Sequence, residues 1–149
     1  MKTLVVGLGN PILSDDGVGI HIAQEIKRLC QNVEIIEASA AGFRLLDEII
    51  GYDKVIIIDA MRKEKGIPGK LHRLSPENFV STLHYTSPHD ISFFEALQIM
   101  QKKKAKLPST IIIYGIEVRE TSIFSENCTE EVQKEIPQIT QKIIQNELQ

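Results

Sequence analysis

A glycine-rich turn near the start of the chain, residues 7–19, constrains the fold more than any other stretch. Before this turn, residues 4–6 form a short, apolar, valine-rich run, which is typical of a strand buried on both faces of a parallel sheet. After the turn, apolar residues recur at helical spacing and form one stripe: Val18, Ile22, Ile26 and Leu29. We therefore expect a buried strand that passes through a tight glycine turn into an amphipathic helix.

The rest of the chain continues to alternate strand and helix patterns. Further strand-like runs lie at residues 33–36, 54–60 and 110–116, and helical patterns separate them. This alternation predicts an α/β layer structure with a mostly parallel sheet. A half-exposed strand at 70–74 follows the 54–60 run too closely for a crossover helix, so we expect it to be antiparallel.

Composition limits the class of protein. With 149 residues, the chain is expected to form one domain over residues 1–149. A formal net charge of −3 does not suggest a nucleic-acid-binding surface. The two cysteines, Cys30 and Cys128, have no zinc-site spacing and are typical of a reducing cytoplasm. No apolar stretch approaches the roughly 18 residues of a membrane span, and we expect a monomeric cytoplasmic protein without membrane insertion.

Two carboxylates and a histidine are expected to meet at one edge of the sheet. Asp16 follows the first strand and Asp59 ends the third, and ligands of open α/β sheets bind beyond the carboxyl ends of strands where the strand order reverses. Residues 87–90 resemble a helix start, which places His89 on the same edge in its neutral, metal-binding form. Two carboxylates and one imidazole suit a borderline transition metal.

Each of these residues also has a structural interpretation. An aspartate after a strand is often a cap, and Asp15 and Asp16 are also favoured as charges at a helix start. A lone histidine is usually structural or solvated, and this expectation is strongest for three of the four: His21, His72 and His84.

Two alternative functions start from the glycine turn alone. The turn resembles a dinucleotide fingerprint, with Glu37 placed as a ribose-binding acid, but the third glycine is absent and Asp15 and Asp16 would repel a pyrophosphate. The segment Gly-Leu-Gly-Asn-Pro at residues 7–11 also resembles the peptidyl-tRNA hydrolases, but the stretch that carries their catalytic histidine is missing here.

Five motifs, in order and in register, resemble the hydrogenase maturation endopeptidases. They are the Gly-x-Gly-Asn at 7–10, the Asp-Asp-Gly-x-Gly at 15–19, the Ala-Gly at 41–42, the Asp-Ala at 59–60 and the Ser-Pro-His at 87–89. The resemblance implies a three-layer αβα sandwich on a five-stranded, mostly parallel sheet with one antiparallel strand. It also implies an endopeptidase that removes a C-terminal peptide from the nickel-loaded precursor of a nickel-iron hydrogenase large subunit.

The resemblance also assigns roles to residues. It implies that Asp16, Asp59 and His89 contact nickel that the substrate carries, rather than a permanently bound cofactor. Asp16 and Asp59 are the expected catalytic residues, of an aspartic-type or a metal-assisted peptidase, and no arrangement of residues requires an acyl-enzyme intermediate. The residues expected to contact the substrate are Gly9, Asn10, Asp15 and Gly42.

Two questions stay open from the sequence. A non-catalytic checkpoint or chaperone that binds the nickel-bearing subunit would use the same residues as a protease. The segments Ile-Glu-Val at 116–118 and Phe-Ser-Glu at 124–126 resemble members that accompany coenzyme F420-reducing or energy-converting hydrogenases, which leaves the identity of the partner hydrogenase undecided.

Overall fold

The computed structural model describes residues 1–76, 82–84, 93–102 and 106–149. Its strands are β1 (Thr3–Leu8), β2 (Glu34–Ala38), β3 (Lys54–Met61), β4 (Leu71–Leu74) and β5 (Thr110–Glu117). Its helices are the 3-10 turn η1 (Ser14–Gly17), α1 (Val18–Leu29), α2 (Phe43–Ile49), α3 (Phe93–Lys102), α4 (Glu130–Gln133) and α5 (Ile136–Glu147).

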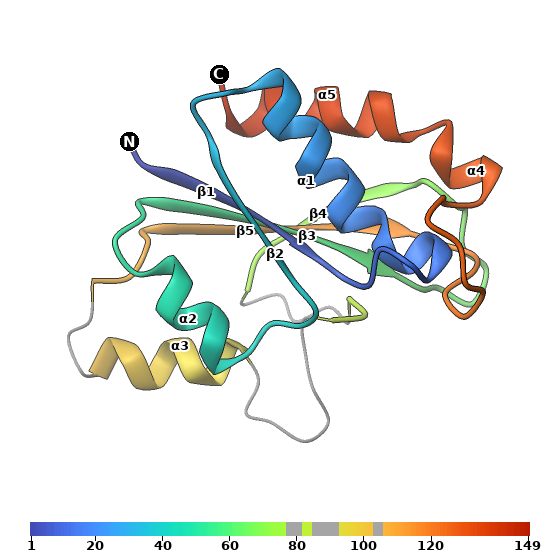
Figure 1. Ribbon diagram of the computed structural model, residues 1–149. Coiled ribbons are helices and arrows are strands. Elements are labelled where there is room, and N and C mark those ends of the chain that lie inside the picture. Colours follow the sequence, from blue (N-terminus) through green and yellow to red (C-terminus); the bar gives the residue numbers. More distant parts are fainter. Residues whose placement is uncertain (77–81, 85–92, 103–105) are drawn as a thin grey trace.

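The strands form one five-stranded sheet in the order β2-β1-β3-β5-β4, shown in Figure 1. The pairs β1–β2, β1–β3 and β3–β5 are parallel, and β4–β5 is antiparallel. Both the mostly parallel sheet and the antiparallel fourth strand expected from the sequence are confirmed.

Helices cover both faces of the sheet and produce two separate cores (Figure 1). Val5 packs in the core that α1 and α5 cover, whereas its neighbours Leu4 and Val6 pack in the core beneath α2 and α3. Successive strand side chains point to opposite faces, so a strand covered on both sides must be apolar throughout. Burial on both faces of the sheet therefore explains the uninterrupted apolar runs in the sequence.

The strand order reverses between β1 and β3. From β1 the chain first forms β2 on one side and then crosses to form β3 on the other. The connections after these strands therefore diverge at their carboxyl ends, which leaves room for a ligand at that edge. Asp16 follows β1 at this edge, and Asp59 lies in β3 two positions before its last residue.

The C-terminal region is helical. It forms α4 followed by α5, with Pro137 in the first turn of α5. A proline fits there because the first helical N–H groups have no partner within the helix. In the described part of the chain, no helix is long and apolar enough to cross a membrane.

Candidate functional site

Asp59 is a fully buried carboxylate that is held from several sides. Its Oδ1 accepts a hydrogen bond of 2.8 Å from the Ala60 backbone N–H and lies 2.7 Å from Nδ1 of His84. Its Oδ2 accepts a hydrogen bond of 2.6 Å from the His84 backbone N–H. The side chain is 0% exposed, so these contacts replace the water that an ionised carboxylate requires. Asp59 is therefore fixed in position before any substrate arrives.

Asp16 approaches the same point from the turn after β1. Its Oδ2 accepts a hydrogen bond of 2.9 Å from the Asn10 backbone N–H, and its Oδ1 lies 3.1 Å from Nε2 of His84. The turn closes this tightly because Gly9 has a φ of +133°, and a Cβ atom there would lie 2.1 Å from the Asp16 carbonyl oxygen. Gly9, the second glycine of the Gly-x-Gly-Asn motif, is thus required for the position of Asp16.

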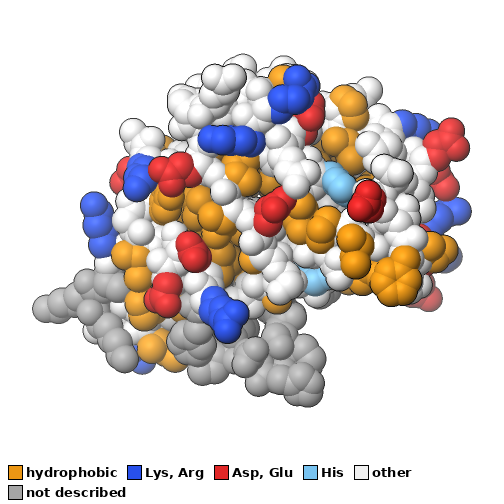
Figure 2. Space-filling view, in the orientation of Figure 1, with side chains coloured by type: hydrophobic (Ala, Val, Ile, Leu, Met, Phe, Trp, Pro, Cys, Tyr) orange, Lys and Arg blue, Asp and Glu red, His pale blue; other side chains and the backbone are white. Residues whose placement is uncertain are grey.

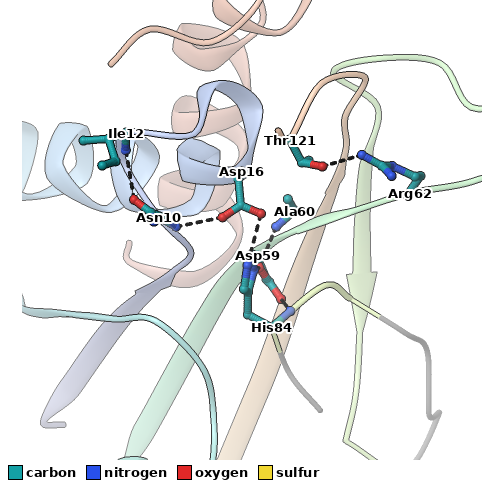
Figure 3. Close-up of polar contacts among 8 residues, drawn as sticks. All are labelled: Asn10, Ile12, Asp16, Asp59, Ala60, Arg62, His84 and Thr121. Atoms are coloured by element: carbon teal, nitrogen blue, oxygen red, sulfur yellow. Dashed lines mark hydrogen bonds and ion pairs between the residues drawn. The ribbon is translucent and has the colours of Figure 1, made fainter. Parts of the chain in front are cut away.

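His84 lies between the two carboxylates, as Figure 3 shows, with one ring nitrogen facing each of them. Burial lowers the pKa of His84, but the hydrogen bonds and charges of Asp59 and Asp16 outweigh burial and hold that pKa above its usual value. The sequence predicts a structural or solvated histidine at position 84, and the structure places it in contact with both carboxylates. The local sequence offers no signal for it, because nothing in the spacing around residue 84 indicates a contact with Asp16.

Three other residues that the sequence predicts for the site are His89, Asn10 and Gly42. His89 lies outside the described residues, so its role as a ligand stays a prediction. Asn10 contacts Asp16 through its backbone and, through Oδ1, accepts a hydrogen bond of 3.1 Å from the Ile12 N–H. Gly42 precedes α2, and its neighbour Ala41 donates a backbone hydrogen bond of 2.8 Å to the His84 carbonyl, so this loop borders the site.

Asp15 points away from the pair of carboxylates. It is 0% exposed, and its Oδ2 accepts hydrogen bonds of 3.1 Å from the backbone N–H groups of Arg119 and Glu120. Its Oδ1 accepts a hydrogen bond of 2.7 Å from the Thr129 N–H. The structure gives Asp15 the role of holding both ends of the 119–129 loop, and its expected contact with substrate stays a prediction.

Positive charge is scarce at the site. Arg62 follows Asp59 by three positions, but its guanidinium is hydrogen-bonded to the Thr121 hydroxyl (Figure 3). Across the described residues, His84 is the one basic side chain within 4.0 Å of either Asp16 or Asp59. Two buried carboxylates thus share one imidazole, which is an arrangement that attracts a cation.

A ready-made metal site is not visible in the described residues. Within them, no group of three or more His, Cys, Asp or Glu side chains is arranged to hold a metal ion. The two carboxylates and the imidazole are instead engaged with one another through hydrogen bonds. They provide oxygen and nitrogen donors of the types that a borderline metal accepts, and a metal would have to replace the contacts with His84.

Covalent catalysis by cysteine has no support at this site. Burial and the charge of Asp15 raise the pKa of the Cys128 thiol to about 12, so it is not the thiolate that acts as a nucleophile. Cys30 is the residue that follows α1 and ends the helix, away from the carboxyl edge of the sheet. The site therefore offers carboxylates and an imidazole, which can move protons to and from water.

Comparison with known proteins identifies the family. The family model described as hydrogenase maturation protease matches residues 20–146. The hydrogenase 2 maturation protease of Escherichia coli (strain K12) is 28% identical over 120 residues, which are 78% of this chain and 73% of that protein. Protein FrxA of Pyrococcus furiosus is 31% identical over 135 residues, which are 89% of this chain and 95% of that protein.

A solved structure agrees with the sequence comparisons. The hydrogenase maturating endopeptidase HybD from E. coli superposes with a TM-score of 0.77 at 25% identity, covering 98% of this chain and 91% of that one. These matches decide against the dinucleotide-binding and peptidyl-tRNA hydrolase alternatives. The chain therefore belongs to the hydrogenase maturation protease family and is a peptidase.

Proposed function

We propose that this protease removes a C-terminal peptide from the nickel-loaded precursor of a nickel-iron hydrogenase large subunit, and that Asp16 and Asp59 contact the nickel that the precursor carries. One observation carries the proposal: two buried carboxylates meet at the carboxyl edge of the sheet, and within the described part of the chain one imidazole, that of His84, is their shared counter-charge. Family membership supplies the class of reaction.

The charge balance of the site supports recognition of a cation. An ionised carboxylate without water is costly unless positive charge or hydrogen bonds compensate for it. Among the described residues, Asp16 and Asp59 together have only backbone N–H groups and His84 for this purpose. A divalent ion delivered by the substrate adds the missing positive charge, so loaded precursor is expected to bind better than precursor without nickel.

The nitrogen ligand has two candidates. His84 already lies 3.1 Å from Asp16 and 2.7 Å from Asp59, so a small rotation of its ring keeps a nitrogen beside an arriving ion. His89 is the histidine that the family motif indicates, and it stays a prediction. Nickel accepts imidazole and carboxylate ligands together with thiolates of the substrate, so either histidine suits it.

The chemical step needs only water and these side chains. A carboxylate of Asp16 or Asp59 accepts a proton from water while the resulting hydroxide attacks the scissile carbonyl carbon. The C–N bond then breaks, and the proton passes from the carboxyl group to the leaving amine. Substrate-borne nickel holds the peptide beside this pair, so positioning contributes much of the rate. Whether the metal also polarises the carbonyl decides between a metal-assisted and an aspartic-type peptidase.

A groove beside the site has room for part of a peptide. It has a volume of about 540 Å³ and lies between the end of β2 and α2, with Glu37, Ala38, Arg44 and Glu48 among its lining residues. The backbone N–H of Gly9 donates a hydrogen bond of 3.0 Å to the Ala38 carbonyl, so the groove borders the same turn that holds Asp16. Grooves of this size accommodate ligands of several residues or fewer.

The test is the intact mass of a large-subunit precursor from the same organism, measured before and after anaerobic incubation with this protein. We expect loss of a C-terminal peptide from nickel-loaded precursor and no change in nickel-free precursor. Binding of the loaded precursor without any loss of mass, for every hydrogenase precursor of that organism, would replace the protease with the nickel checkpoint.

A further inference from the structure

Two loops at the carboxyl edge of the sheet leave large apolar side chains in solvent. Ile12, in the turn after β1, is 47% exposed, and in the loop after β5 Ile123 and Phe124 are 60% and 80% exposed. We call these three residues the apolar tip. In the orientation of Figure 2, hydrophobic side chains gather at the lower right, the end of the molecule where these loops lie. Exposed apolar clusters of this kind mark interaction surfaces.

The loops that carry the apolar tip are firmly held. The Ser125 N–H donates a hydrogen bond of 3.0 Å to the Ile12 carbonyl, and the Ser14 N–H donates one of 2.9 Å to the Ser125 carbonyl. Leu13 and Ser125 form a parallel β-bridge. The buried carboxylate of Asp15 binds backbone N–H groups at both ends of the 119–129 loop. Phe124 is thus presented to solvent by an ordered loop, which lowers the entropy lost when a partner covers it.

The apolar tip is continuous with the proposed reaction site. Ile12 donates its backbone N–H to the Asn10 side chain, and the Asn10 N–H binds the Asp16 carboxylate. Arg62, three residues after Asp59, contacts Thr121 in the other loop of the tip. A folded protein whose C-terminal segment reaches Asp16 and Asp59 must therefore lie over or beside these loops.

We propose that the apolar tip is a docking surface for the folded body of the large-subunit precursor, and that it contacts an apolar patch of the precursor next to the cleaved segment. This inference rests on the proposed function and deepens it. Asp16 and Asp59 then recognise nickel and the scissile peptide, while the tip recognises the folded protein. Large apolar anchors surrounded by polar residues carry much of the binding energy of such interfaces.

The test compares wild type with the double variant Ile123→Ser/Phe124→Ser on nickel-loaded precursor. We expect KM for cleavage and Kd for precursor binding to rise about tenfold or more, with kcat nearly unchanged, because the tip binds protein and touches no reacting atom. Phe124→Leu, which keeps an apolar anchor, should stay within about threefold of wild type. The control is Ile50→Ser, a 39% exposed isoleucine just after α2 at the opposite edge of the sheet.

Each outcome separates this inference from the proposed function. If wild type does not cut the loaded precursor, the proposed function fails. If wild type cuts it and the double variant keeps its KM and Kd, the docking surface is overturned. An unchanged KM together with the loss of a wild-type dimer in light scattering would assign the tip to self-association. An unaltered melting temperature of the double variant ensures that any loss of affinity does not come from unfolding.

Discussion

Carboxylates are buried at both edges of the sheet, but the groups that compensate for their charge differ between the two edges. At the amino edge, the Glu147 carboxylate near the end of α5 is only 2% exposed and lies 3.0 Å from Nζ of Lys54 and 2.8 Å from Nε of Arg73. It also accepts a hydrogen bond of 2.5 Å from the Tyr114 hydroxyl. At the carboxyl edge, Asp16 and Asp59 share one histidine.

This difference separates a structural cluster from a reactive one. Burial raises the pKa of Glu147, but the hydrogen bonds from Arg73, Tyr114 and Lys54 outweigh burial and lower that pKa to about 2. Two of its partners, Lys54 and Arg73, are permanent cations, so the cluster is complete without a ligand and fastens α5 to the sheet. The partner of Asp16 and Asp59 is an imidazole, whose charge is not permanent, although the two carboxylates hold the pKa of His84 above its usual value. The carboxyl edge is therefore the one that an external cation can complete.

The largest expected effect comes from removing a charge at the carboxyl edge. Asp59→Asn should lower the rate of precursor cleavage by about 10³-fold or more, because the variant loses both a general base and a contact to the nickel. The measurement is the cleaved fraction of loaded precursor over time by intact mass. Asp53→Asn, an exposed aspartate at the amino edge, is the control and should cleave at the wild-type rate. Full activity of Asp16→Asn and Asp59→Asn would remove both residues from the site.

The histidine variants sharpen the assignment within the carboxyl edge. His84→Ala should reduce cleavage about 100-fold, because the carboxylates lose their shared partner and the nickel loses a nearby nitrogen ligand. His89→Ala, assayed alongside it, tests the ligand that the family motif indicates. A large loss in His89→Ala with none in His84→Ala would make His84 a structural partner of the carboxylates and His89 the ligand.

At the amino edge, the expected effect is on stability instead. Glu147→Gln should lower the free energy of unfolding by about 2 kcal/mol, because Lys54 and Arg73 lose their counter-charge in a mostly buried cluster. The cleavage rate of the folded variant should not change. The control is Glu25→Gln, which disrupts an exposed ion pair with Arg28 and should cost less than about 1 kcal/mol. Equal losses in both variants, by urea unfolding, would refute the structural role of Glu147.

The smallest effect is the pH dependence of that same cluster. The folded-state pKa of Glu147 is lowered, so its stabilising contribution is complete above the ordinary glutamate value of 4.5 and is lost as the pH falls toward 2. The difference in unfolding free energy between wild type and Glu147→Gln should therefore be constant from about pH 5 to about pH 7, because the Glu147 carboxyl group is ionised there in the unfolded state as well. The difference should shrink at lower pH. A difference that grows on acidification would contradict this sign.

Much of the framework follows from local sequence patterns. The buried strands are predictable because a strand covered on both faces needs apolar side chains on both, as residues 55–58 of β3 have. The antiparallel β4 follows from a connection too short for a crossover helix. The meeting of Asp16 and Asp59 follows from the parallel pairing of β1 with β3 and from the reversal of strand order between them.

Tertiary structure alone decided which side chains fill the space between these elements. His84 is 25 positions from Asp59, Thr129 is 114 from Asp15, and Lys54 is 93 from Glu147. Hydrophobic periodicity determines which face of an element is buried, but it does not specify which distant polar group meets another at the sheet edge. The sequence therefore determined the fold and the pair of aspartates, while packing decided that His84 joins them and that Asp15 holds a loop.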